Sequence, residues 1–335
     1  MPVSIKDIAK VANVSFSTVS RALANSPRVK PETRRRIQQL ATEMGYAPSA
    51  AARSLVTNRT KTIGVVATTM TDTFQAEVVE SIEEIAIQND YSLILTQSGF
   101  ASEREMVEIQ ALRERRVDGI ILISVRVGGV YASVLQGTGI PLVFINSRQT
   151  DYGHSVRVDS LAGSRTVVRY LLELGHRRIA YIAGPDQDWD NVARQAGYRQ
   201  SLETYRLPID PALIVQGNSR PDGGIRAMQQ LLALRHPPTA VFCYNDVTAL
   251  GAMRAAFQAG LRIPADVSIV GFDDIYLARF FEPPLTTIAQ PIKQLAEKAV
   301  QTILASLQGS DETVDSVLPG ELVVRGSTYF PNSSI

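Results

Sequence analysis

The fold of the amino-terminal region is decided by residues 5–23, which read IKDIAKVANVSFSTVSRAL. Apolar residues recur in this stretch at helical spacing, and Ser4 with Asp7 three positions later has the spacing of a capping box. The pattern predicts one helix over residues 5–12, then a tight turn, and a second helix over residues 16–24.

The second helix is expected to bury one face and to expose the other. Its apolar arc consists of Val19, Ala22 and Leu23. The opposite arc carries aromatic, hydroxyl and guanidinium groups, on Phe16, Ser17, Ser20 and Arg21. A third helix should begin at Pro31 and end before Gly45, which tolerates a left-handed backbone. Two helices joined by a short turn are typical of a helix-turn-helix, whose second helix fits the major groove of DNA.

Charge is distributed unevenly along the chain of 335 residues. Residues 1–60 contain ten Lys or Arg against three Asp or Glu, a balance of +7, whereas the remainder has a balance of −6. A basic amino-terminal region followed by an acidic remainder favours nucleic acid as the partner of residues 1–60. A merely solvated basic surface is the alternative explanation of the charge.

The composition, 45% apolar and 20% charged, is that of an ordinary globular protein of two or three domains. The single cysteine, Cys243, cannot form a disulfide within the chain, which indicates a reducing compartment. No apolar run approaches the ~18 residues of a membrane span, and the amino terminus lacks a signal-peptide core. We therefore expect a cytoplasmic protein without a membrane partner.

Several motifs together resemble the LacI/GalR family of bacterial transcriptional repressors. The first two are residues 5–23 and residues 28–55, RVKPETRRRIQQLATEMGYAPSAAARSL. Further motifs are LGHRRIAYIAGP (174–185), YNDVTALGAM (244–253) and PPLTTIAQP (283–291). The resemblance covers about residues 3–330. It implies an α/β fold class: an all-α helix-turn-helix domain followed by a two-lobed, doubly wound parallel-sheet effector domain like a periplasmic binding protein.

The resemblance divides the chain into a helix-turn-helix domain (1–47), a hinge helix with linker (48–61), and an effector-binding and dimerisation domain (62–330). In the last domain it implies an N-lobe, about 62–159 plus 290–319, and a C-lobe, about 160–288 plus 321–330. One departure is Lys30, where many relatives have a helix-capping Ser or Thr.

Residues 48–55, PSAAARSL, resemble the hinge helix of this family. A helix this short is marginal in water, so we expect it to fold when two copies pack together on DNA. By resemblance, Leu55 wedges into the minor groove and kinks the operator. A flexible Ala-rich linker is the alternative for the free state.

Helix-turn-helix geometry and the resemblance together give a set of candidate DNA contacts. Arg21 can donate two hydrogen bonds to a guanine, Phe16 can touch a thymine methyl, and Arg34 to Arg36 can approach phosphates. A small helical bundle with a basic surface is the alternative. The complete set is Ser4, Ile5, Ser15, Phe16, Ser17, Thr18, Ser20, Arg21, Asn25, Arg28, Arg34, Arg53 and Leu55.

From Thr62 onward, short apolar runs alternate with helical patterns, as in parallel sheets covered on both faces. The predicted strands are 62–67, 91–96, 119–124 and 141–146, then 178–183, 213–216, 240–243 and 268–271. Two such sets imply two doubly wound lobes, with a ligand outside the carboxyl ends of the strands.

No catalytic or metal-binding set is recognisable, so we expect no enzyme, no metal and no cofactor. His154, His176 and His236 are scattered without metal-ligand spacing. His176 follows Gly175, where a helix should end, and is expected to cap that end.

Polar residues near the predicted strand ends, together with the aromatic residues Phe74, Trp189 and Tyr244, are the candidates for binding an effector. By resemblance, Arg194, Asn245 and Asp273 fall where sugar-responsive relatives bind effector. Planar amide, carboxylate and guanidinium groups beside an aromatic ring suit a sugar. Asp246 has a plainer explanation, as the cap of the following helix. The complete set is Phe74, Asn146, Arg148, Trp189, Arg194, Asn245, Asp273 and Gln290.

The hypothesis is therefore a homodimeric repressor of sugar-utilisation genes that binds a palindromic operator and is released by a small carbohydrate. An anionic sugar derivative is also considered, because Arg126 and Arg148 are placed near the cleft. A dimer is expected because the short tail after Arg325 contains Pro331 and no leucine heptad.

Two alternatives stay open at this point. One is a corepressed regulator that responds to a purine or another nucleobase, because residues 214–217 and 226–230 resemble the purine repressor of the family. However, the purine-recognising arginine and the stacking phenylalanine of that relative fall at Asp188 and Ser219. The other is a solute-binding protein for sugar uptake, against which the helix-turn-helix pattern argues.

Overall fold

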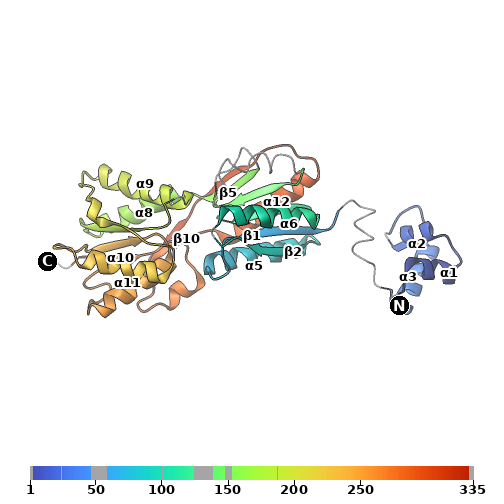
Figure 1. Ribbon diagram of the computed structural model, residues 1–335, viewed down its shortest axis with the longest axis horizontal. Helices are drawn as coiled ribbons and strands as arrows, with labels where there is room; N and C mark the ends of the chain where they lie inside the picture. Colours follow the sequence, from blue (N-terminus) through green and yellow to red (C-terminus); the bar gives the residue numbers. More distant parts are fainter. Residues whose placement is uncertain are drawn as a thin grey trace. The chain divides into compact units, whose positions relative to one another are not determined.

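The computed structural model describes residues 3–23, 25–46, 59–99, 101–123, 139–147, 153–186 and 188–331. The chain forms two compact units, Met1–Thr60 and Lys61–Ile335, and each is described by itself. Figure 1 shows the helices of the first unit and the two lobes of the second.

The first unit contains three helices around a small apolar core. They are α1 (Ile5–Ala12), α2 (Phe16–Leu23) and α3 (Pro31–Glu43). Ile8, Val19 and Ile37 are fully buried at their centre. The predicted capping box is confirmed, because Asp7 accepts the Ser4 N–H at 2.9 Å and the Asp7 N–H reaches Ser4 Oγ at 3.4 Å. As expected, Lys30 supplies no side-chain cap for α3.

The N-lobe of the second unit contains a six-stranded parallel sheet in the order β11-β5-β4-β3-β1-β2. Buried residues of α5 (Thr73–Gln88) and α12 (Ile292–Leu307) pack on one face, and those of α6 (Ser102–Glu114) pack on the other. The strands are β1 (Thr62–Ala67), β2 (Ser92–Gln97), β3 (Gly119–Ile123), β4 (Leu142–Ile145), β5 (His154–Val158) and β11 (Asp315–Leu318).

The C-lobe contains a four-stranded parallel sheet in the order β7-β6-β8-β9. Figure 1 shows α8 and α9 on one side of this sheet and α10 and α11 on the other. The strands are β6 (Ile179–Ala183), β7 (Ile214–Gln216), β8 (Ala240–Cys243) and β9 (Ser268–Val270). The helices are α8 (Ser160–Glu173), α9 (Trp189–Thr204), α10 (Pro221–Leu232) and α11 (Asp246–Gln258), with short 3-10 helices η2 (Pro211–Leu213) and η3 (Tyr276–Phe280).

The chain passes between the lobes at three places, near Asp159, Gln290 and Pro319. Two short strands at this junction, β10 (Thr287–Ala289) and β12 (Glu321–Val323), pair in antiparallel fashion. Because β10 also bridges Asp273 beside β9, the junction lies next to the carboxyl ends of the C-lobe strands.

The sequence analysis does not predict four of the described strands, and the reason is common to all of them. These strands are β5, β10, β11 and β12. β5 interrupts its apolar pattern with His154 and Arg157, and β11 at the sheet edge alternates between exposed and half-buried residues. β10 and β12 are three residues each, too short for a recognisable pattern. Their pairing partners, rather than their own residues, determine that they are strands.

His176 caps the end of α8, as expected, and it does so through its backbone. The backbone N–H of His176 closes the end of α8 by donating to Leu171 O at 3.1 Å. Its imidazole is buried and lies 2.9 Å from both Thr239 Oγ1 and Tyr329 O. The ring therefore links the start of β8 to the carboxyl-terminal segment, and burial lowers the pKa of this histidine.

Candidate functional site

Helix α2 presents a row of exposed side chains from its first two turns. Phe16 is 54% exposed, although it is aromatic, and Ser17 and Arg21 are also exposed. Ser15 Oγ accepts the Thr18 N–H at 3.2 Å, so the serine before the helix is its cap. Thr18 and Ser20 are partly exposed on the same helix.

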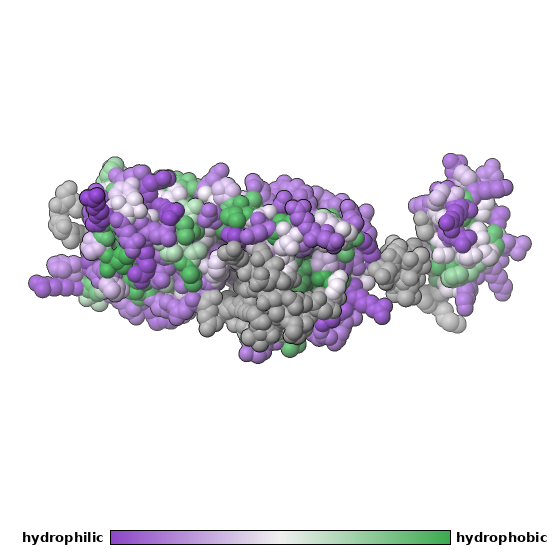
Figure 2. Space-filling model, turned by 90° about the horizontal axis from the view of Figure 1, so that it is seen from above, coloured by the Kyte–Doolittle hydropathy of each residue, from purple (hydrophilic) through white to green (hydrophobic). Residues whose placement is uncertain are grey.

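The other candidate DNA contacts of the first unit vary in exposure. Ser4, Asn25 and Arg28 are exposed, while Ile5 and Arg34 are partly buried. The hydrophilic surface of this unit is visible in Figure 2. Arg53 and Leu55 lie outside the described residues.

The side chains in the predicted basic run Arg34–Arg36 have different surroundings. Arg34 is partly buried and its guanidinium lies 3.4 Å from Val29 O. Arg36 donates to Ala12 O and so closes the carboxyl end of α1. Arg35 and Arg36 are both exposed, so phosphate contacts by these two residues stay a prediction.

A narrow cleft lies between the two lobes at the carboxyl ends of their strands. The space between its side chains is about 40 Å³, which is room for a few water molecules. Its lining comes from loops after β1, β4, β6, β8 and β9 and from the junction after β10. The described lining residues are Thr68, Asp72, Phe74, Gln75, Asn146, Pro185, Asp188, Asp190, Arg194, Ser219, Tyr244, Asn245, Asp273 and Gln290.

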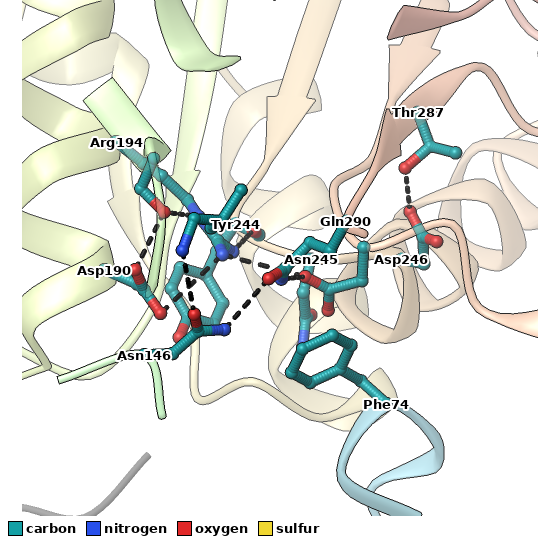
Figure 3. A network of polar contacts seen from close by, with 12 residues as sticks. Phe74, Asn146, Asp190, Arg194, Tyr244, Asn245, Asp246, Thr287 and Gln290 are labelled. Carbon is teal, nitrogen blue, oxygen red and sulfur yellow. Dashed lines mark hydrogen bonds and ion pairs between the residues drawn. The ribbon is translucent and has the colours of Figure 1, made fainter. Parts of the chain in front are cut away.

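A chain of hydrogen bonds crosses this cleft (Figure 3). Asn146, after β4, accepts the Val158 N–H at 3.1 Å and donates to Gln290 Oε1 at 2.9 Å. Gln290 in turn donates to Asp273 Oδ1 at 2.7 Å. The chain thus joins an N-lobe strand, the junction and a C-lobe strand, and all three side chains are buried.

Arg194 on α9 is the central charged group of the cleft, and its side chain is only 2% exposed. Its Nε lies 3.3 Å from Ser160 Oγ, and its Nη1 donates to Tyr244 O at 2.6 Å. Its Nη2 pairs with Asp273 at 3.6 Å and Asp190 at 3.9 Å. A buried guanidinium is tolerated because these acceptors replace water.

Burial controls the ionisation of the carboxyl groups around Arg194. It raises the pKa of Asp190 to about 6 and the pKa of Asp273 well above its usual value, although Arg194 opposes both shifts. Burial also raises the pKa of Asp72, against two backbone hydrogen bonds at the start of α5. These buried carboxyl groups of the cleft therefore lose their protons less readily than exposed ones do.

The structure brings together Phe74, Asn146, Arg194, Asn245, Asp273 and Gln290 of the predicted effector set. Trp189 does not line the cleft and is 44% exposed at the start of α9. Arg126 and Arg148 lie outside the described residues.

Sequence reasoning missed several lining residues, among them Thr68, Asp72, Gln75 and Asp190, and misassigned one cap. Asp72 and Gln75 have the spacing of a helix-capping pair, so their position at a strand-to-helix turn could have been recognised. Thr68 and Asp190 gave no signal beyond their positions near strand ends. The cap of α11 is Asn245, which accepts the Thr248 N–H at 2.9 Å, rather than Asp246.

Asp246 lies behind the cleft and bonds to other elements (Figure 3). Its Oδ1 accepts the Thr287 hydroxyl at 2.5 Å, and its Oδ2 accepts the Ile275 N–H at 3.0 Å. The side chain is fully buried, and this burial raises the pKa of Asp246 to about 7.

Within the described parts of the chain, no helix is long and apolar enough to cross a membrane. The same residues contain no group of three or more His, Cys, Asp or Glu side chains arranged to hold a metal ion.

Two protein-family models match the chain. Residues 4–49 match the bacterial regulatory proteins of the lacI family, and residues 168–328 match a periplasmic binding protein-like domain. The chain is 38% identical to the HTH-type transcriptional repressor PurR of Klebsiella pneumoniae (strain 342), covering 94% of this chain and 93% of the relative. It is 37% identical to the HTH-type transcriptional repressor CytR of Escherichia coli (strain K12), covering 97% and 96%.

Solved structures agree over nearly the whole length. The Lac repressor dimer bound to operator and the anti-inducer ONPF superposes with a TM-score of 0.89 at 30% identity, covering 98% of this chain and 100% of the other. The complex of the transcriptional regulator CelR with cellobiose has a TM-score of 0.75 at 29% identity, covering 97% and 99%.

We predict that Asp246 makes the protein less stable as the pH rises. The folded state retains the Asp246 proton up to about pH 7, whereas an unfolded aspartate releases it near pH ~4. Between these values the folded state binds more protons, so the free energy of unfolding falls with increasing pH. In Asp246→Asn, the amide can accept from Ile275 and donate to Thr287, so the fall should be shallower.

The measurement is urea unfolding of both proteins from pH 4.5 to 8. The matched control is Asp90→Asn, an exposed residue with a left-handed backbone that Asn tolerates. Equal pH slopes in wild type and Asp246→Asn would contradict the prediction.

Proposed function

Because the chain belongs to the LacI family of bacterial regulatory proteins and is a DNA-binding transcriptional repressor, we propose that a small sugar bound in the cleft releases it from its operator. The observation that carries this proposal is the row of amide, carboxylate and guanidinium groups on Asn146, Gln290, Asp273 and Arg194. Residues 1–47 would bind DNA, residues 48–61 would form the hinge, and residues 62–330 would bind the effector and dimerise.

Helix α2 is the proposed base-reading element. An α-helix fits the major groove, and the exposed Ser17 and Arg21 lie on the face that also carries Phe16. A half-exposed aromatic ring on an eight-residue helix is unfavourable in water and is suited to contact with a thymine methyl. Exposed positive charge on Arg28 and Arg35 supports phosphate contacts around this helix.

We expect Arg21→Ala to lower affinity for the operator about tenfold or more, because a bidentate contact with guanine contributes about 1–3 kcal/mol. Affinity for unrelated DNA should fall much less. The measurement is fluorescence anisotropy with operator and scrambled duplexes at fixed salt.

The control is Arg35→Ala, which removes the same charge from the exposed face of α3. It should weaken binding to both duplexes by similar factors. If Arg21→Ala behaves like this control, Arg21 does not read bases.

The geometry of the cleft supports a mechanism of lobe movement. With room for only a few water molecules, the lobes must separate before a sugar can enter. At the rim, the Tyr276 N–H of the C-lobe donates to Glu77 Oε1 on α5 of the N-lobe at 2.8 Å. A ligand that bridges both lobes changes the population of their arrangements, and this change is the proposed signal to the DNA-binding unit.

Two effector classes remain as candidates. The similarity to a regulator solved with cellobiose and the hydroxyl-matching groups of the cleft support a sugar. A nucleobase or nucleoside is the second candidate, because PurR and CytR are more similar in sequence than the cellobiose-bound regulator. Asp188 and Ser219, which line the cleft, favour the sugar, since neither offers a cationic or stacking group to a purine.

The effector class is tested by thermal shift with sugars, nucleosides and purines, followed by operator binding with each hit. We expect a sugar to raise Tm through binding to the native state and to weaken operator binding. A purine or nucleoside that raises Tm and strengthens operator binding would instead establish the corepressed alternative.

We propose that the repressor acts as a homodimer, as the Lac repressor in the operator complex does. An apolar surface, which we call the η3 patch, is exposed on α11 and η3. It consists of Leu250, Phe257, Tyr276, Leu277 and Phe280. A cluster of large exposed apolar residues marks an interaction surface, and a second copy is the partner that a palindromic operator requires.

We predict that Phe280→Asp converts the dimer to a monomer and weakens operator binding, because it places a charge within the η3 patch. Sedimentation velocity measures the change. The control is Val107→Asp, since Val107 on α6 is as exposed as Phe280 and lies outside the patch. An unchanged sedimentation coefficient for Phe280→Asp would rule out this interface.

A further inference from the structure

The described lining of the cleft contains four carboxyl groups against a single positively charged side chain. The carboxyl groups belong to Asp72 from the N-lobe and to Asp188, Asp190 and Asp273 from the C-lobe, and the cation is Arg194. Formal charges thus sum to −3 within the described lining. A binding site for a phosphate or carboxylate normally has the opposite balance.

Arg194 is already engaged within the protein. Its donors face Ser160, Tyr244 O, Asp190 and Asp273. One face of its guanidinium is covered by the Phe272 ring, 3.7 Å from the guanidinium carbon. Bidentate binding of an anionic ligand requires two parallel N–H groups, which this arrangement directs to protein acceptors instead.

Helix amino termini are the other common anion sites, and those of α5, α9 and α11 adjoin the cleft. Each is closed by a side chain that lines the cleft. Asp72 accepts the Phe74 N–H of α5 at 3.0 Å, and Asp188 accepts the Asn191 N–H of α9 at 3.0 Å. Asn245 caps α11 in the same way. Two of the three caps are carboxylates, so they place negative charge where a phosphate would bind.

We propose that the cleft selects uncharged, hydroxyl-rich ligands and rejects their phosphorylated or acidic counterparts. This inference rests on the proposed effector function. It adds a preference for uncharged over negatively charged ligands, which we call the charge rule. It replaces the anionic sugar derivative considered from the sequence, which depended on Arg126 and Arg148.

The carboxyl groups face one another across the cleft. After burial, the charge of Asp188 on the opposite lobe also raises the pKa of Asp72, and the charges of Asp246 and Asp72 add to the effect of burial in raising the pKa of Asp273. An anion between them would add repulsion in a site from which water is largely excluded, where such interactions are strongest. Neutral hydroxyl groups, in contrast, can donate hydrogen bonds to the carboxylates.

The test compares neutral and anionic members of matched pairs by isothermal titration calorimetry on the full chain. The pairs are glucose with glucose 6-phosphate and gluconate, ribose with ribose 5-phosphate, and cytidine and adenosine with their 5′-monophosphates. We expect the neutral member of a binding pair to bind at least tenfold more tightly. Equal or tighter binding of the anionic member would overturn the proposal.

Variants identify the residues that impose the charge rule. In Asp72→Asn and Asp188→Asn, the amide oxygen can still cap the helix, because Asn is as good a cap as Asp. Each variant should reduce the preference for the neutral member several-fold, and the double variant should reduce it further. Asp311→Asn, a change at an exposed position outside the cleft lining, should leave the preference unchanged.

A second measurement does not require an identified effector. Inorganic phosphate, compared with chloride at equal ionic strength, should raise the Tm of the double variant more than that of the wild type. The basic DNA-binding unit is the same in both proteins, so the difference reports the cleft. Equal shifts would refute the charge rule.

The two proposals fail in different ways. If only the nucleoside pairs bind and the neutral member is preferred, the sugar proposal fails and the charge rule stands. If sugars bind but their phosphates bind equally well, the charge rule fails and the sugar proposal stands.

Discussion

The buried guanidinium of Arg194 is the interaction on which the effector cleft depends. A charge that is 2% exposed must be matched inside the protein, and Asp190, Asp273, Ser160 and the Tyr244 carbonyl provide the match. These partners come from α8, α9 and the ends of β8 and β9. Pairing the charge therefore ties the ends of β8 and β9 to helices α8 and α9 at the cleft.

From this centre, polar contacts extend into the N-lobe. Gln290 donates a hydrogen bond to Asp273 and accepts one from Asn146. The position of the junction residue Gln290 is therefore linked to the sheets of both lobes. At the rim, the contact between Glu77 and Tyr276 joins α5 to η3, which also carries much of the exposed η3 patch. A change in the separation of the lobes would act on this contact between Glu77 and η3, and so on the proposed dimer surface.

The helix-turn-helix and most of the strands could be predicted because their signals are local. A capping box at Ser4, an apolar arc around Val19 and continuous β-branched runs each determine structure within a few residues. β5 and β11 could not be predicted, since His154 and the alternating edge residues make sense only beside their neighbours. The partners of the His176 ring, Thr239 and Tyr329, could not be predicted for the same reason, because they are distant in sequence.

The sequence by itself determined the class of regulator, the separation of positive from negative charge, and the residue types at the strand ends. Only the tertiary structure decided how those residues combine. Asn146 and Gln290 are 144 positions apart, yet they share a hydrogen bond, and Trp189, five positions before Arg194, lies outside the cleft. Charge pairing and burial act through space, so the ionisation of Asp190, Asp246 and Asp273 depends on neighbours that no local pattern specifies.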